Sequence, residues 1–139
     1  MRKLTFAAAA GALLFAGHAY AADPFTLTSP AFKDGTLMPK KMAGGNKANP
    51  NCVGENVSPA LSWANPPAGT KSYALLMFDP DGRPPGGVSH WVAYGIPISV
   101  TGFAEGEVRK ASEKYIGGKS TMGVGNYSGA CTRPGAAHH

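Results

Sequence analysis

The sequence predicts a single, mainly β domain whose strands are arranged as a sandwich. Two observations lead to this prediction. Glycine and proline are abundant, with 19 and 12 residues, and they interrupt the chain throughout. The apolar segments between them are short, and several have the length of a strand rather than that of a helix.

Four segments are expected to form strands, and they cover residues 25–28, 61–63, 73–78 and 91–96. The first alternates polar and apolar residues and stops at a Ser-Pro pair, while the second ends at a turn rich in proline and glycine. The third and fourth are nearly continuous apolar runs. We therefore expect the strand at residues 73–78 to be buried, with the strand at 91–96 following it.

The remaining segments are expected to be mostly irregular. Residues 40–54 form a polar loop rich in Gly, Asn and Lys, and residues 117–135 are glycine-rich. Residues 104–116 are the one helical candidate, where a short surface helix and an irregular loop both stay open because apolar positions are few. Four strands are too few for two packed sheets with covered edges. We therefore expect residues 22–139 to be one domain whose C-terminal part is missing.

The N-terminus predicts export. Arg2 and Lys3 precede an apolar stretch at residues 4–15, and Ala19-Tyr20-Ala21 has the small-x-small pattern of a cleavage site. Residues 1–21 are therefore expected to be a signal peptide, and the mature protein to be periplasmic or secreted. The apolar stretch is too short for a comfortable membrane span, and no integral membrane segment is expected after cleavage.

The charge of the chain does not indicate a nucleic-acid partner. The 13 basic and 8 acidic residues give a net charge of +5, which falls to +3 when Arg2 and Lys3 are removed with the leader. The lysines are scattered, and no basic stripe alternates with aromatic residues. An ordinary solvated surface explains this distribution.

The two cysteines, Cys52 and Cys131, are a candidate disulfide, since an exported protein meets an oxidising compartment. Such a bond would stabilise the fold by about 4 kcal/mol in the chain-entropy model. Two free, partly buried thiols remain the alternative, because the sequence does not place the two Cα atoms within reach.

The turn between the third and fourth strands holds the most informative polar residues. Asp79 follows one apolar run and His90 precedes the next. If the two strands are neighbours, both side chains can face one pocket at their shared end. Asp79-Pro80-Asp81 taken alone is typical of a turn, so the pocket depends on residues elsewhere in the chain.

Five ordered blocks of this sequence resemble the phosphatidylethanolamine-binding protein (PEBP) family, in its bacterial branch labelled Raf kinase inhibitor-like or YbhB/YbcL. They cover residues 52–63 (CVGENVSPALSW), 71–75 (KSYAL), 79–81 (DPD), 90–97 (HWVAYGIP) and 126–138 (NYSGACTRPGAAH). The order and spacing of the blocks fit that family over nearly the whole mature chain.

The resemblance implies a large central β-sheet packed on a smaller sheet with peripheral helices. It also implies a small cavity that binds anions such as phosphate or the head group of a phospholipid. On this chain the cavity residues would be Asp79, His90 and His138, with Gly129 in an adjoining loop. The further candidates for anion binding are Asp81, Arg83, Trp91 and Arg133, although Trp91 is most simply a core aromatic.

The chain departs from the family pattern in the adjoining loop. Gly129-Ala130-Cys131-Thr132-Arg133 replaces a proline-rich loop, and Gly82-Arg83 stands where Ala-Pro usually follows the DPD motif. These changes bear on the rigidity of the loop and on the charge of the cavity.

The implied function is that of an exported, non-enzymatic binding protein without a cofactor. Its partner would be phosphate, a phosphorylated small molecule or a phospholipid head group, and it would act as a regulator or inhibitor of a protein partner. Histidine N–H groups can donate to phosphate oxygens, Asp79 can orient an imidazole, and backbone N–H groups around Gly129 can form an anion-binding nest.

Two enzymatic alternatives stay open. Asp79, Asp81, His90 and His138 are of the residue types that bind zinc in a metal-dependent hydrolase, although they lack HxH or HExxH spacing. Ser89 or Ser128 could act as a nucleophile with a histidine, but no nucleophile-elbow motif is present.

Overall fold

The structure of the protein, a computed structural model, describes residues 23–133 and 135–139. The expected signal peptide at residues 1–21 lies outside the described residues.

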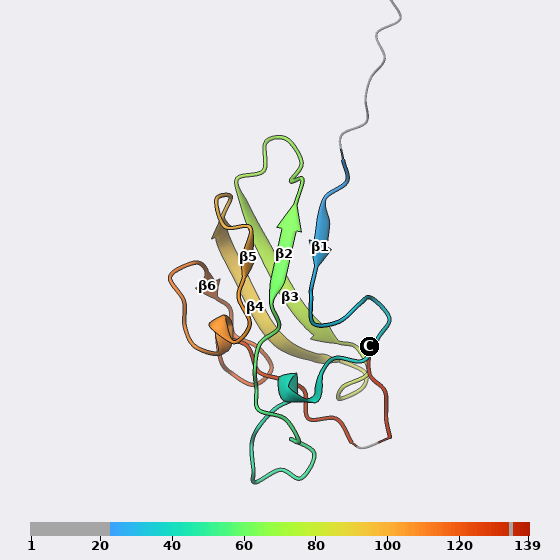
Figure 1. Cartoon of the computed structure of the whole chain (residues 1–139). Coiled ribbons are helices and arrows are strands. Elements are labelled where there is room, and N and C mark those ends of the chain that lie inside the picture. The colour runs from blue at the N-terminus through green and yellow to red at the C-terminus, as the bar shows by residue number, and fades with distance from the viewer. Residues whose placement is uncertain (1–22, 134) are drawn as a thin grey trace, which may run out of the picture.

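The described residues form two antiparallel three-stranded sheets, with strand orders β1-β2-β5 and β3-β4-β6 (Figure 1). The elements are β1 (Thr26–Thr28), η1 (Lys40–Met42), β2 (Leu61–Ala64), β3 (Ser72–Asp79), β4 (Val88–Pro97), β5 (Gly102–Phe103), η2 (Glu107–Arg109) and β6 (Ile116–Gly117). The two η elements are short 3-10 helices. The prediction of a mainly β fold with two sheets is therefore confirmed. No helix in the described part of the chain is long and apolar enough to cross a membrane.

Each of the four expected strands is present, and two were missed. β4 begins at Val88 instead of at residue 91, so His90 lies within this strand and not before it. The missed strands, β5 and β6, have two residues each. Two residues are too few to show the alternation by which a strand is recognised in a sequence.

The helical candidate at residues 104–116 forms no α-helix, and its only helical part is the three-residue η2. Gly106 has a φ of 76°, and Lys110 has the extended φ and ψ of −128° and 169°. Neither conformation can be part of an α-helix. The side chain of Val108 between them is fully buried, which ties this irregular segment to the core.

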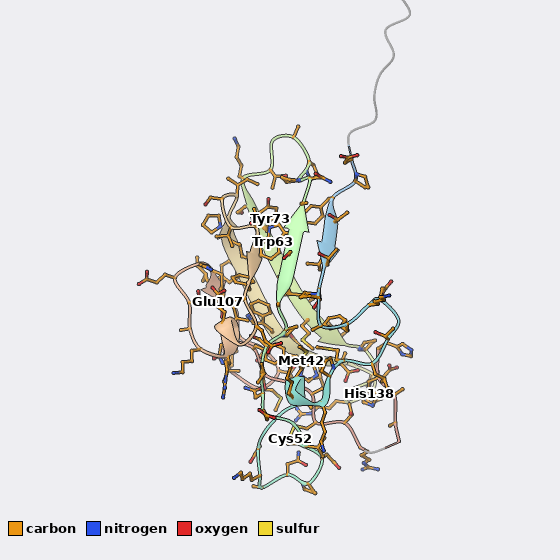
Figure 2. The ribbon with its side chains drawn as sticks, viewed as in Figure 1. Met42, Cys52, Trp63, Tyr73, Glu107 and His138 are labelled. Atoms are coloured by element: carbon orange, nitrogen blue, oxygen red, sulfur yellow. A yellow bond between two sulfur atoms is a disulfide. The ribbon has the colours of Figure 1, made fainter. Side chains whose placement is uncertain are left out.

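The core lies between the two sheets and consists largely of aromatic rings. Trp63, Trp91, Phe103 and Tyr115 meet edge to face, with centroids 5.4 to 5.8 Å apart. Such pairs contribute about 0.5–1.5 kcal/mol each beyond the area that they bury. Figure 2 shows Trp63 and Tyr73 together, where the sheets face one another.

Strand β3 is less buried than its sequence predicts. None of residues 72–78 is buried, and Leu76 and Phe78 keep 61% and 46% of their surface exposed. Exposed and half-buried residues alternate along the strand, so one face of β3 packs toward the core, while Leu76 and Phe78 lie on the more exposed face. Among the described residues β3 is also an edge strand, since it pairs with β4 alone.

Candidate functional site

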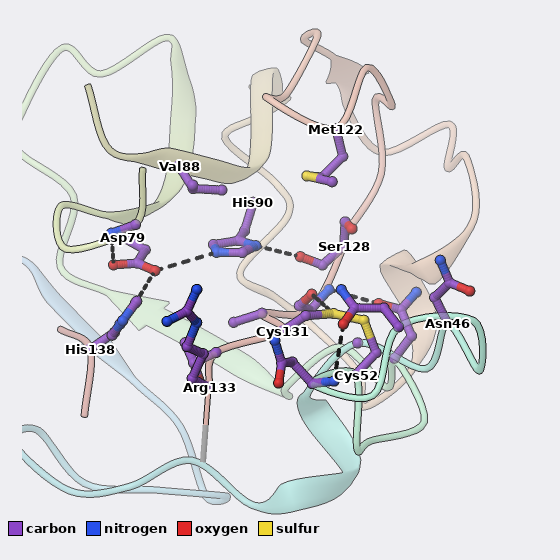
Figure 3. Close-up of a pocket in the computed structure, with 18 of the residues that line it drawn as sticks. Asn46, Cys52, Asp79, Val88, His90, Met122, Ser128, Cys131, Arg133 and His138 are labelled. Atoms are coloured by element: carbon purple, nitrogen blue, oxygen red, sulfur yellow. Dashed lines mark hydrogen bonds and ion pairs between the residues drawn. A yellow bond between two sulfur atoms is a disulfide. The ribbon is translucent and has the colours of Figure 1, made fainter. Parts of the chain in front are cut away.

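A cavity of about 1050 Å³ lies at the end of the β3–β4 hairpin (Figure 3). Asp79 is the last residue of β3 and pairs with Val88, while His90 lies two residues farther along β4. The antiparallel pairing of these strands thus brings the two side chains to the same end of the sheet, and both line the cavity.

Seven of the eight candidate residues line this cavity, and these are Asp79, Asp81, Arg83, His90, Gly129, Arg133 and His138. Trp91 does not. Its side chain is 1% exposed and packs in the aromatic core against Phe103 and Tyr115. The simpler interpretation of Trp91 as a core aromatic therefore describes its place in the structure.

The buried carboxylate of Asp79 connects the residues of the site. Its Oδ1 accepts hydrogen bonds from the backbone N–H groups of Asp81 and Gly82, both at 2.9 Å. Its Oδ2 accepts one from His138 Nδ1 at 2.7 Å. Burial alone would raise the pKa of Asp79, but the hydrogen bonds from His138, Gly82 and Asp81 outweigh it and hold the pKa below its usual range. Asp79 is thus an ionised, fixed acceptor at neutral pH.

His90 is buried, and only one of its ring nitrogens has a hydrogen bond. Nδ1 lies 2.9 Å from the carbonyl oxygen of Ser128, so the network assigns a proton to Nδ1. Nε2 lies 3.9 Å from Asp79 Oδ2, and within the described residues it has no hydrogen-bond partner. Buried polar atoms are nearly always paired, so this nitrogen requires an explanation. When Nε2 is also protonated, it becomes a donor beside the cavity.

The C-terminal residues form one side of the cavity. Figure 1 marks the C-terminus beside the end of β3, and Figure 3 shows His138 directed at Asp79. The next residue, His139, donates to Asp81 Oδ2 from its backbone N–H and from Nδ1, both at 3.0 Å. Hydrogen bonding by the backbone and then by the side chain of His139 lowers the pKa of Asp81.

The other side of the cavity is held by a disulfide between Cys52 and Cys131, whose Cα atoms are 4.4 Å apart. This bond joins the loop after η1 to the segment that carries Gly129 and Arg133. In Figure 3 the side chain of Arg133 extends toward the space between His90 and His138.

Gly129 does not offer its N–H to the cavity as the sequence analysis expected. This N–H donates to Asn56 Oδ1 at 2.7 Å. A Cβ at position 129 would collide with the carbonyl of Met42 and the backbone of Ala43. The close approach of two backbones therefore requires glycine here, and the N–H of Gly129 itself is not free to join the anion-binding nest expected around it.

Apart from its histidines, the cavity is lined by equal numbers of basic and acidic side chains. Three arginines and three carboxylates line it, and these are Arg83, Arg109, Arg133, Glu55, Asp79 and Asp81. Arg109 was missed by the sequence analysis, because it lies at the end of η2 and has no motif around it. Within residues 23–133 and 135–139, no three His, Cys, Asp or Glu side chains are grouped so that they could hold a metal ion.

The chain is similar in sequence to a known protein family and to several bacterial proteins. A family model described as phosphatidylethanolamine-binding protein matches residues 28–139. UPF0098 protein YbcL of Escherichia coli (strain K12) is 35% identical over 92 residues, which are 63% of this chain and 50% of that protein. A Mycobacterium tuberculosis protein named as a candidate lipoprotein, LppC, is 34% identical over 120 residues, or 86% of this chain and 53% of that protein.

The fold has a solved counterpart. A crystal structure of Escherichia coli YbcL, described as a new member of the mammalian PEBP family, matches with a TM-score of 0.73 and 31% identity. The match covers 82% of this chain and 71% of that one. This chain spans about half the length of the curated relatives YbcL and LppC.

Proposed function

The chain belongs to the phosphatidylethanolamine-binding protein family, and on that premise we propose that it is an exported, non-enzymatic binding protein. Its ligand is a phosphate group, either free or carried by a small molecule or a phospholipid. The pocket at Asp79, His90 and His138 binds this group.

The observation that carries the proposal is the Nε2 of His90, which has no hydrogen-bond partner in the part of the chain that the structure describes. This nitrogen is buried, and the hydrogen bond from Nδ1 to Ser128 fixes the orientation of the ring. A phosphate oxygen is the acceptor that a protonated Nε2 lacks, and a hydrogen bond between two ions is about twice as strong as a neutral one. Two of the nearby arginines, Arg83 and Arg133, add positive charge at the same cavity.

Asp79 serves this site by orienting its donors. Because a carboxylate only accepts, the 2.7 Å contact with His138 places a proton on His138 Nδ1 and fixes that ring as well. The same negative charge opposes a bare phosphate dianion, so binding of modest strength is expected.

Export is part of the proposal. It is supported by the expected signal peptide at residues 1–21 and by the lipoprotein name of the mycobacterial relative.

The proposal is tested by following the histidine imidazole NMR signals while inorganic phosphate or phosphoethanolamine is added. We expect both ligands to shift or broaden the signals of His90 and His138 at millimolar concentration. His90→Ala should remove the response of His138. His139→Ala changes an exposed histidine outside the lining of the cavity and should keep that response. Histidine signals that stay unchanged would contradict the proposal. One equivalent of tightly held zinc in the purified protein would favour the hydrolase alternative instead.

A further inference from the structure

We propose that Asp81 is a positioning residue that fixes the peptide bond after His138 and so holds the His138 imidazole against Asp79. The role in ligand binding rests on the proposed function, whereas the positioning itself can be measured without a ligand. Asp81 thereby acts on the ligand through His138 and does not touch it.

The contacts of Asp81 support this role. Asp81 Oδ2 accepts a hydrogen bond from the backbone N–H of His139, which is part of the peptide bond between His138 and His139. A second hydrogen bond reaches the same oxygen from His139 Nδ1, also at 3.0 Å. Because the peptide plane is rigid, fixing its N–H also restricts the position of the His138 Cα atom.

The C-terminal segment has few other attachments. Among the described residues, the hydrogen bonds that join residues 135–139 to the rest of the fold go to Asp79 and Asp81, apart from a 3.2 Å turn bond from Ala136 to Arg133. The side chain of His138 is 26% exposed, so packing alone does not fix it. Without Asp81, the single contact with Asp79 would have to order residues 135–139, which costs conformational entropy.

The charge of Asp81 makes the inference testable. A carboxylate beside an anion site repels the anion, so removing it should strengthen phosphate binding if charge were its only effect. If Asp81 instead positions His138, loss of its acceptor oxygen should weaken phosphate binding. The half-exposed carboxylate can be replaced without disturbing the aromatic core, because its side chain is 45% exposed.

Two substitutions separate the acceptor from the charge. Asp81→Ala removes both, and we expect it to weaken phosphate binding about threefold to tenfold, which corresponds to the loss of one or two hydrogen bonds. Asp81→Asn keeps an acceptor oxygen for the His139 N–H, so affinity should stay within about twofold of wild type or increase. His139→Ala is the matched control, since it removes the imidazole and keeps the backbone N–H. Its affinity should also stay within about twofold.

A double-mutant cycle tests whether Asp81 acts through His138. In the His138→Ala background, Asp81→Ala should cause no further loss of affinity. Tighter binding by Asp81→Ala in the wild-type background, or an undiminished loss in the His138→Ala background, would overturn the inference.

A measurement on the ligand-free protein distinguishes failure of the inference from failure of the proposed function. Asp81→Ala should move the His138 ring signals toward those of an unconstrained histidine and speed exchange of the His139 amide, whereas Asp81→Asn should restore both. Unchanged signals in Asp81→Ala would overturn the positioning role. The wild-type protein could fail to bind phosphate although the His138 and His139 signals change in Asp81→Ala. In that case the proposed ligand is wrong and the positioning role stands.

Discussion

His90 Nε2 lies 3.9 Å from Asp79 Oδ2 across the end of the β3–β4 hairpin. This separation is too long for a hydrogen bond but short enough for the two groups to affect one another electrostatically. His138 already binds the same oxygen at 2.7 Å. The site thus holds two imidazoles around one carboxylate. One of them is hydrogen-bonded to it, and the other has no hydrogen-bond partner at Nε2 among residues 23–133 and 135–139.

The stabilising effect of Asp79 should depend on pH. Its pKa is lowered in the folded protein, so its contribution is present above the unfolded value near 3.9 and is lost as pH falls through the folded pKa. We expect Asp79→Asn to lower the free energy of unfolding by about 1–3 kcal/mol at pH 7. Urea unfolding of both proteins measures this difference, which should shrink below about pH 4. An equal difference at pH 3 and pH 7 would contradict the assignment.

Tyr127 should titrate unusually late. Its ring is fully buried, its hydroxyl donates to the carbonyl of Met42 at 2.7 Å, and burial raises its pKa to about 12. Since the folded protein then binds the proton more tightly than the unfolded chain, stability should fall as pH rises from about 10 to 12. Tyr127→Phe should reduce that slope and cost about 1–2 kcal/mol at pH 7, because Met42 loses its donor. A smaller slope should remain from Tyr115, since burial also raises the pKa of that group. Absorbance titration and chemical unfolding measure the two effects. An undiminished slope in Tyr127→Phe would assign it to other groups.

The Cys52–Cys131 disulfide should matter to both the fold and the site. It closes a loop between residues 79 positions apart, so replacing both cysteines by alanine should lower stability by about 4 kcal/mol in the chain-entropy model. Because Cys131 lies in the wall of the cavity near Arg133, phosphate binding should weaken as well. Thermal unfolding and NMR titration of the double variant test this, with dithiol-reduced wild type as the comparison. Wild-type affinity in the double variant would show that the wall holds without the bond.

Even the methyl side chain of alanine at position 129 should destabilise the protein. A methyl group at this position would collide with the Met42 carbonyl and the Ala43 backbone, so Gly129→Ala forces two segments apart. We expect a loss of about 1–3 kcal/mol. Gly86→Ala is the matched control, because a Cβ there meets no atom within 4 Å and the backbone is not left-handed. Similar unfolding midpoints for the two variants would contradict the packing role.

The sequence was most informative where structure is local. The β3–β4 hairpin follows from two apolar runs flanking a turn, and this alone brings Asp79 and His90 to one end of the sheet. The position of His138 was expected only through the family resemblance, because 59 residues separate it from Asp79. The hydrophobic periodicity of the sequence does not predict a contact between residues so far apart.

Other features of the site depend on tertiary contacts that a single sequence does not reveal. Arg109 reaches the cavity because the segment around it folds back as an irregular loop. The N–H of Gly129 donates to the side chain of Asn56, which lies 73 residues away in the sequence, so the loss of this donor from the expected nest could not be predicted from the sequence.

The open edge of β3 has a consequence for handling the protein. Residues 72–78 carry neither a charge nor a proline, which are the features that usually keep an edge strand from joining another sheet. Leu76 and Phe78 are exposed on the same strand, so the backbone edge and an apolar surface are presented together. Raising the protein concentration should therefore favour strand-to-strand aggregation through β3.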